Sequence, residues 1–278
     1  MLEFLIPNIV LCRAIEAMVS ASVACAILGV IITRIGISSI GFTMSHAAFA
    51  GAAVGLFLGI PMTIAAVASS LLVATLIGPL SDRARMSPDT TLGVLFSMSM
   101  AVAIFFIAWM QTTGNGMSAA TLLYGNITSL YEHEVYGLLA VSVIASLFVI
   151  VFYKEITAII FHRKIAEASG INTSPIFYSI LFIIAVSIAL ALTIIGGLLI
   201  FVWLVTPAAI AYQVCRNLKR MFIVAPVIAV CVSIVGAVAG ISWSLPVAPL
   251  TAVLFALVFA FAVLISPRRR ITNSKNYH

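Results

Sequence analysis

Long apolar runs separated by short polar connections form the dominant pattern of this sequence. All but one of the runs span about 17–20 residues, the length at which an α-helix crosses the hydrocarbon core of a bilayer. The runs cover residues 17–33, 44–60, 62–80, 91–110, 135–153, 175–214, 222–241 and 247–265. The stretch 175–214 is long enough for two helices, and we expect Gly196-Gly197 to separate them. The pattern predicts about eight or nine spans, because a re-entrant element could replace one.

The connections and the composition complete this picture. Residues 1–16 are expected to form a short interfacial helix, residues 154–174 a charged amphipathic segment, and residues 266–278 a polar tail. The chain is 63% hydrophobic and 8% charged, whereas a soluble domain carries about 25% charged residues. We therefore expect an all-α, polytopic membrane bundle that forms a single transmembrane domain over residues 1–278.

The positions of the charged residues predict the orientation. When the run 175–214 is counted as two spans, all but one of the 14 Lys and Arg residues lie after the first, third, fifth and seventh spans or in the tail: Arg34, Arg83, Arg85, Lys154, Arg163, Lys164, Arg216, Lys219, Arg220, Arg268, Arg269, Arg270 and Lys275. The exception is Arg13, and the loops of the opposite side carry Glu132 and Glu134. By the positive-inside rule, residues 154–174 and the tail are cytoplasmic and the N-terminus is external. This distribution also argues against nucleic acid as a partner, despite the net charge of +6.

No catalytic or nucleotide-binding motif accompanies the apolar runs. The sequence contains no GxxxxGK[ST] loop, no HExxH motif and no Ser-His-Asp grouping. The four cysteines are dispersed without a paired spacing. We therefore expect neither an enzyme activity nor a bound cofactor on this chain, which leaves transport or a channel.

Residues 40–59 form the most informative apolar run, because it holds a histidine. Gly51, Gly55 and Gly59 recur every four residues, so on a helix they form one smooth face against which a neighbouring helix can pack. His46 is a titratable, metal-capable side chain inside a span, which is by default a hypothesis for a transport site. The alternative is a hydrogen-bonded histidine with a structural role.

The segment 154–174 is the second informative feature. It is expected to be helical, to display Ile160, Phe161, Ile165 and Ala168 along one side, and to end at Gly170. Such a helix can lie on the bilayer surface. Alternatively, it docks onto a cytoplasmic partner with Phe161 as the anchor.

Six short motifs follow one another along the chain. They are Arg34 with Gly41, His46, Ala47 and Gly51; Asp89, Gly93, Phe96 and Ser97; Leu123, Gly125, Asn126 and Ile127; Phe161, Ala166 and Gly170; Gly197 to Ala211 with Thr206-Pro207-Ala208-Ala209; and Ser266 to Arg269. In this order they resemble the permeases of zinc, manganese and iron ABC importers. Each motif is weak alone, but the succession covers most of the chain.

The resemblance implies a helical permease subunit that works as a dimer in the cytoplasmic (inner) membrane of a bacterium. Its implied partners are a cytoplasmic ATP-binding subunit, an external metal-binding protein and membrane lipid, with a divalent metal as cargo. His46 is implied as a pathway or ligand residue. Coupling to the ATPase is implied for the matched positions of the cytoplasmic segment, which are Phe161, His162, Ala166 and Gly170.

Phe42 departs from the family's pattern, since relatives usually have aspartate four residues before the histidine. His162 likewise stands where relatives have aspartate. Zinc accepts imidazole and sulfur ligands, whereas manganese favours carboxylate oxygens, so we expect zinc ahead of manganese and iron. Met44 and Met98 are the candidate sulfur ligands, with core packing as the alternative role.

Glu132-His133-Glu134 places three metal-capable groups in a row on the external side. The segment is either a solvated loop without a partner, or a contact for the binding protein or an incoming cation. Two rival functions remain open: an ABC permease for a non-metal solute, and a stand-alone channel or secondary cation transporter. The latter ordinarily needs buried carboxylates for its coupling ion, and the apolar runs contain none in their middle.

Overall fold

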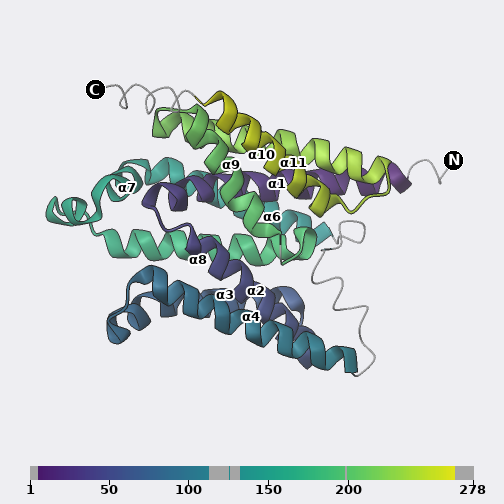
Figure 1. The fold of residues 1–278 in the computed structure, drawn as a ribbon, viewed down its shortest axis with the longest axis horizontal. Helices are drawn as coiled ribbons and strands as arrows, with labels where there is room; N and C mark the ends of the chain where they lie inside the picture. The colour runs from purple at the N-terminus through teal and green to yellow at the C-terminus, as the bar shows by residue number, and fades with distance from the viewer. Residues whose placement is uncertain (1–5, 113–124, 126–131, 198, 267–278) are drawn as a thin grey trace.

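The computed structural model of the protein describes residues 6–112, 125, 132–197 and 199–266, and it is all-helical over these residues (Figure 1). The helices are α1 (Ile6–Ile35), α2 (Ser39–Leu58), α3 (Met62–Ala84), α4 (Pro88–Thr112), α6 (Glu132–Val151), α7 (Tyr153–Ala168), α8 (Thr173–Ile195), α9 (Ile200–Val214), α10 (Leu218–Ser242) and α11 (Val247–Ile265). The predicted all-α class is confirmed. The tail from residue 267 onward, and the connection that holds Asn126, lie outside the described residues.

Eight of the described helices are long and apolar enough to cross a membrane, and α9 is a shorter apolar helix. Together they coincide with the predicted spans, when the run 175–214 is counted as two, so the prediction of eight or nine spans is confirmed. The expected break in the run 175–214 falls at Gly196, whose φ of 87° ends α8. The expectation of a separate interfacial helix over residues 1–16 is wrong for the described part. No glycine or proline occurs at residues 8–28, across the expected boundary at residue 16, so α1 continues without a break from Ile6 to Ile35.

Two helices, α1 and α2, form the centre of the bundle. α2 packs against α3 and α4, whereas α1 packs against α6, α9 and α10. α8 joins the two groups, because it contacts α3 and α2 on one side and α1 and α6 on the other. In Figure 1, α7 and the C-terminal end of α11 lie toward the left, and the start of α1 lies toward the right.

Close helix contacts explain part of the glycine pattern. A Cβ atom at Gly51 would lie 2.4 Å from the carbonyl oxygen of Ala65 in α3, and one at Gly55 would lie 2.5 Å from the Ala65 Cβ. Both glycines therefore let α2 and α3 approach closely. For Gly59 the packing prediction is wrong. It has φ of 72°, caps the end of α2 and has open space around its Cβ position.

A buried polar contact fastens α1, α9 and α10. The hydroxyl groups of Ser22 and Ser233 lie 2.6 Å apart, and the indole Nε1 of Trp203 donates a hydrogen bond of 3.0 Å to the Ser233 Oγ. All three side chains are buried. Because hydrocarbon offers no alternative partner, these hydrogen bonds favour one arrangement of the three helices.

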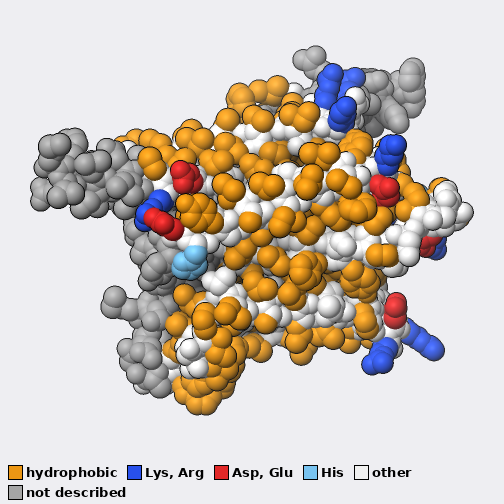
Figure 2. All heavy atoms as spheres, turned by 180° about the vertical axis from the view of Figure 1, so that it is seen from behind, with side chains coloured by type: hydrophobic (Ala, Val, Ile, Leu, Met, Phe, Trp, Pro, Cys, Tyr) orange, Lys and Arg blue, Asp and Glu red, His pale blue; other side chains and the backbone are white. Residues whose placement is uncertain are grey.

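The face of the molecule seen in Figure 2 has a broad apolar band, with charged side chains toward its two ends. Most Lys and Arg side chains in this view lie at the right end, which is the end of α7 in Figure 1. The exceptional Arg13 at the other end forms an ion pair with Glu132 of α6. This pairing accounts for the one basic residue that departs from the charge pattern.

Candidate functional site

His46 lies in the interior of α2 with only 5% of its surface exposed. Its Nδ1 atom is buried and has no hydrogen-bond partner among the described residues. A buried polar atom without a partner is costly and uncommon, so it calls for an explanation. The alternative of a hydrogen-bonded structural histidine does not account for this nitrogen.

Two phenylalanine rings, Phe42 and Phe96, contact His46, and a third, Phe201, contacts Phe42; we call these three rings the aromatic box. The ring centroids of Phe42 and Phe96 lie 4.7 and 4.8 Å from the His46 centroid, both in edge-to-face geometry. Phe42 also contacts Phe96 at 4.4 Å and Phe201 at 5.1 Å. The rings come from α2, α4 and α9, so the box forms where these three helices meet. The Phe42 contact follows from its place one helical turn before His46.

Two polar contacts set the register of α2 against α4. Thr43 donates a hydrogen bond of 3.0 Å to the backbone carbonyl of Leu92, and Ser39 donates one to the carboxylate of Asp89. Asp89 lies in the first turn of α4, where a negative charge is favourable. On α4, Leu92 and Asp89 lie one and two turns before Phe96, and on α2 Thr43 directly follows Phe42, so these contacts hold Phe96 opposite His46.

The methionines expected as sulfur ligands do not belong to this cluster. Met44 is two residues before His46 on α2, and Met98 is two residues after Phe96 on α4. Residues two apart point to different sides of a helix, so both methionines are turned away from the box. Met44 is fully buried in the core, and Met98 is 61% exposed on the outer surface of α4. The burial of Met44 is that expected for core packing.

The chemistry available around His46 is that of one imidazole among aromatic rings. No group of three His, Cys, Asp or Glu side chains that could hold a metal ion occurs among the described residues. A neutral imidazole nitrogen can donate electrons to a metal, and ring faces attract a cation within about 6 Å. The arrangement suits a cation in passage better than one held in a complete coordination shell.

The predicted cytoplasmic segment is the helix α7 with a break at its centre. Two helical pieces meet at His162, whose φ of −166° and ψ of 102° are extended. Phe161 is 71% exposed, and Ile165 is also exposed. Ala166 is buried against the bundle, so its side chain cannot reach a partner. Gly170 ends the helix with φ of 85°, and the hydrogen bonds from Gly170 to Glu167 and from Ile171 to Ala166 form a Schellman cap.

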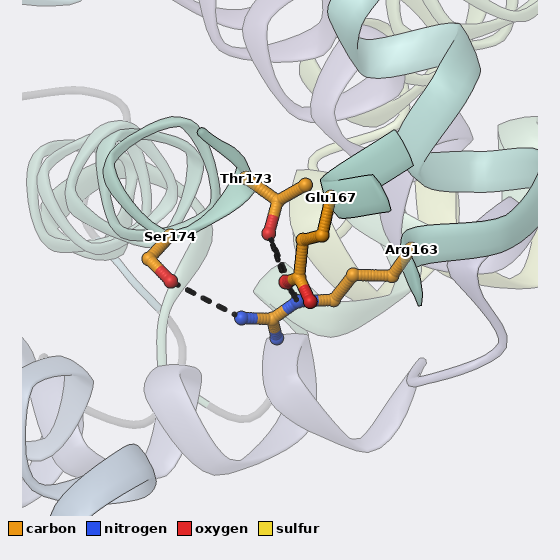
Figure 3. Close-up of polar contacts among 4 residues, drawn as sticks. All are labelled: Arg163, Glu167, Thr173 and Ser174. Atoms are coloured by element: carbon orange, nitrogen blue, oxygen red, sulfur yellow. Dashed lines mark hydrogen bonds and ion pairs between the residues drawn. The ribbon is translucent and has the colours of Figure 1, made fainter. Parts of the chain in front are cut away.

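A polar network fixes the corner between α7 and α8 (Figure 3). The Arg163 Nε donates to the Glu167 Oε1 at 3.0 Å and to the Thr173 Oγ1 at 3.2 Å, and its Nη2 donates to the Ser174 Oγ at 3.4 Å. Thr173 also donates to Glu167, and the guanidinium lies 5.3 Å from the Phe177 ring centroid. The hydrogen bond from Thr173, followed by that from Arg163, lowers the pKa of the Glu167 carboxyl.

Glu132, His133 and Glu134 form the first turn of α6 rather than a loop. The two carboxylates lie at the helix N-terminus, where the backbone amides favour negative charge. Glu132 is engaged with Arg13, as described above. Glu132 therefore has a local role, an ion pair at the end of the bundle opposite α7.

Sequence reasoning missed the partners of the predicted site residues. Phe96 lies in a recognised motif, yet nothing in that motif indicates contact with His46. Phe201 and Thr173 carry no local signal, because their contacts depend on how distant helices pack. Arg163 was visible only as one of several basic residues in a charged segment.

Comparison with known proteins identifies relatives of the whole chain. The model of the ABC 3 transport family matches residues 8–266. The manganese transport system membrane protein MntC of Halalkalibacterium halodurans is 26% identical over 259 residues, which cover 93% of this chain and 88% of that protein. The chelated iron transport system membrane protein YfeD of Yersinia pestis is 27% identical over 263 residues, which cover 95% and 88%.

A solved structure shares the fold. PsaBC from Streptococcus pneumoniae in complex with Fab superposes with a TM-score of 0.83 and 24% sequence identity, covering 95% of this chain and 94% of that chain. At this identity the likeness shows the fold and leaves the roles of single residues open.

Proposed function

This chain belongs to the ABC 3 transport family, and we propose that it is the membrane permease of an ATP-driven importer for a divalent transition-metal ion. The chain itself supplies the pathway and carries out no reaction. ATP would be hydrolysed by separate cytoplasmic subunits, and the cargo would be delivered by an external binding protein. A second permease copy would complete the pathway.

We choose a metal ion as the cargo because the relatives are named as transport proteins for manganese and for chelated iron. Their names give no support to zinc as the first choice, so we rank manganese and iron ahead of it. The rival of a non-metal solute draws no support from the same names.

The observation that carries the proposal is the unpartnered Nδ1 of His46 inside the aromatic box. We propose that this nitrogen meets the ion during passage. The box would keep bulk water away from the histidine, and its ring faces would compensate part of the lost hydration. With Phe42 in place of a carboxylate, the ion would be held weakly and released readily.

The packing offers a route from the partner ATPase to His46. Exposed Phe161 would dock onto the ATPase, and the Arg163 network would transmit its displacement from α7 to α8. α8 packs against α2, which carries His46. Alternating access would follow if these helices move as a unit when the ATPases close. In this scheme, α7 and the C-terminal end of α11 face the cytoplasm.

Uptake by the reconstituted transporter tests the proposal. Proteoliposomes are loaded with ATP on the ATPase side, and the accumulation of manganese, iron and zinc is measured with and without ATP. We expect ATP-dependent uptake of manganese or iron, and a loss of at least about tenfold in His46→Ala, which removes the nitrogen contact. Met98→Leu serves as the control, because it changes an exposed side chain outside the box.

Each rival gives a different result in this assay. Uptake that persists without ATP, together with no co-purifying ATPase, would favour a channel or a secondary transporter. ATP hydrolysis without accumulation of any of the three metals would favour a non-metal cargo. Normal uptake by His46→Ala would remove His46 from the pathway and leave the family assignment intact.

A further inference from the structure

A groove of about 460 Å³ lies between α6 and α10, near the end of the bundle that holds α7. Both helices pack against α1, and the groove runs along the line where they do so. It is lined by Ile27 of α1, Ser146, Val149 and Ile150 of α6, Tyr153 of α7, and Lys219, Phe222 and Ile223 of α10.

The groove is apolar and opens sideways from the bundle. Ile27 and Val149 are buried at its base, whereas Ile150 and Ile223 are exposed at its sides. Ser146 donates its hydroxyl to the carbonyl of Ser142, so it presents no free donor to the groove. Since α6 and α10 are long and apolar enough to span a membrane, the opening faces the acyl chains of the bilayer.

One end of the groove carries positive charge. Lys219 is its only charged lining residue, and no described residue forms an ion pair with it. It is the second residue of α10, where the free backbone amides add to the positive potential. Arg220 and Lys154 adjoin lining residues in the sequence and are exposed.

We propose that this groove binds an anionic phospholipid, with an acyl chain along its apolar wall and the headgroup phosphate on Lys219. A soluble anion would leave the apolar wall empty. A second copy of the chain would have to bury the lysine without a counter-charge, which is costly. The lysine lies at the basic end of the bundle, and the cytoplasmic leaflet supplies anionic lipids that attract basic residues at the surface. This inference is independent of the cargo.

Native mass spectrometry of the purified transporter tests the inference. The detergent-solubilised protein is incubated with equal amounts of phosphatidylglycerol and phosphatidylcholine, and the retained lipid is identified. We expect preferential retention of phosphatidylglycerol, lowered about fivefold in Lys219→Gln, the effect of one lysine near an anionic surface. Ile223→Trp should lower retention by filling the groove. Arg83→Gln is the control, because it removes an exposed basic residue from the same end of the bundle without touching the groove.

Three results would overturn the assignment. Equal retention of both lipids would show that the headgroup charge is not recognised. Unchanged retention by Lys219→Gln and Ile223→Trp would place the lipid elsewhere. A dimer that dissociates in Ile223→Trp while its phosphatidylglycerol remains bound would assign the groove to a second copy of the chain.

Discussion

The phenyl ring of Phe42 meets the imidazole of His46 edge to face, with 4.7 Å between the ring centroids and 73° between the planes. The two residues are one helical turn apart on α2, so any side chain at position 42 stands beside the imidazole. In this chain the neighbour is an aromatic ring. Because its neighbour one turn away is apolar, His46 has no carboxylate beside it on this face of α2.

Phe42→Asp should convert this turn into a two-ligand metal site. Without metal, we expect the melting temperature of the purified permease to fall by roughly 3–6 °C, because a carboxylate is placed in a half-buried apolar site. Manganese should restore much of this loss, since the ion would bind the carboxylate and the imidazole together. Thermal unfolding with and without manganese measures both effects.

Phe42→Leu is the matched control for that experiment, because it removes the ring without adding a ligand. It should lower the melting temperature and show no response to manganese. If Phe42→Asp responds to manganese no more than Phe42→Leu does, position 42 does not face a cation site.

Phe161→Asp should uncouple ATP hydrolysis from uptake while the permease still inserts into the membrane. Phe161 is 71% exposed, so the substitution leaves the bundle intact but places a charge at the proposed ATPase contact. We expect weaker co-purification of the ATPase and uptake reduced to near background. Trp243→Asp is a suitable control, since Trp243 is 70% exposed at the opposite end. Normal uptake by Phe161→Asp would refute the docking role.

Acid should loosen the corner between α7 and α8. The pKa of Glu167 is lowered in the folded protein by the hydrogen bond from Thr173 and then by Arg163. The ionised carboxylate therefore stabilises the corner at neutral pH, above the unfolded-state pKa of about 4.3. This stabilisation is lost as the pH falls from that value through the lower folded-state pKa. Because Glu167 is at the surface, the effect is local.

Hydrogen exchange of residues 163–174 at a series of pH values measures this change. The Glu167→Gln variant supplies the reference at each pH, because its side chain does not titrate. Protection in the wild type should exceed that of the variant at neutral pH and converge with it in acid. A constant difference across the series would show that Glu167 does not hold the corner.

Most of the fold could be predicted from the sequence, because crossing a bilayer requires long apolar helices with satisfied backbones. Helix ends were less predictable. α1 extends outward to Ile6, since Arg13 can stay in the helix where it pairs with Glu132. The spacing of residues along the sequence does not predict an ion pair between segments that are far apart in the chain.

Of the contacts in the candidate site, only the one within α2 could be predicted from the sequence. The spacing of four placed Phe42 beside His46, and the structure bears this out. The expectation of Met44 and Met98 as ligands rested on proximity in sequence, which does not set the direction of a side chain; the structure places Met44 in the core and Met98 on the outer surface of α4. Phe201 belongs to the aromatic box because α9 packs against α2, and no local sequence pattern predicts its contact with Phe42.

Gly51→Ala should destabilise the bundle, whereas Gly93→Ala should not. A Cβ at Gly51 would lie 2.4 Å from the Ala65 carbonyl oxygen and 2.5 Å from the Ser69 Cβ, so α2 and α3 would have to separate. Such overpacking costs about 1–3 kcal/mol. At Gly93 of α4 the added Cβ meets nothing within 4 Å, and alanine should stabilise the helix by about 0.5–1 kcal/mol. Thermal unfolding in detergent should thus shift in opposite directions for the two variants. An unchanged or raised melting temperature of Gly51→Ala would show that the contact between α2 and α3 is not tight at Gly51.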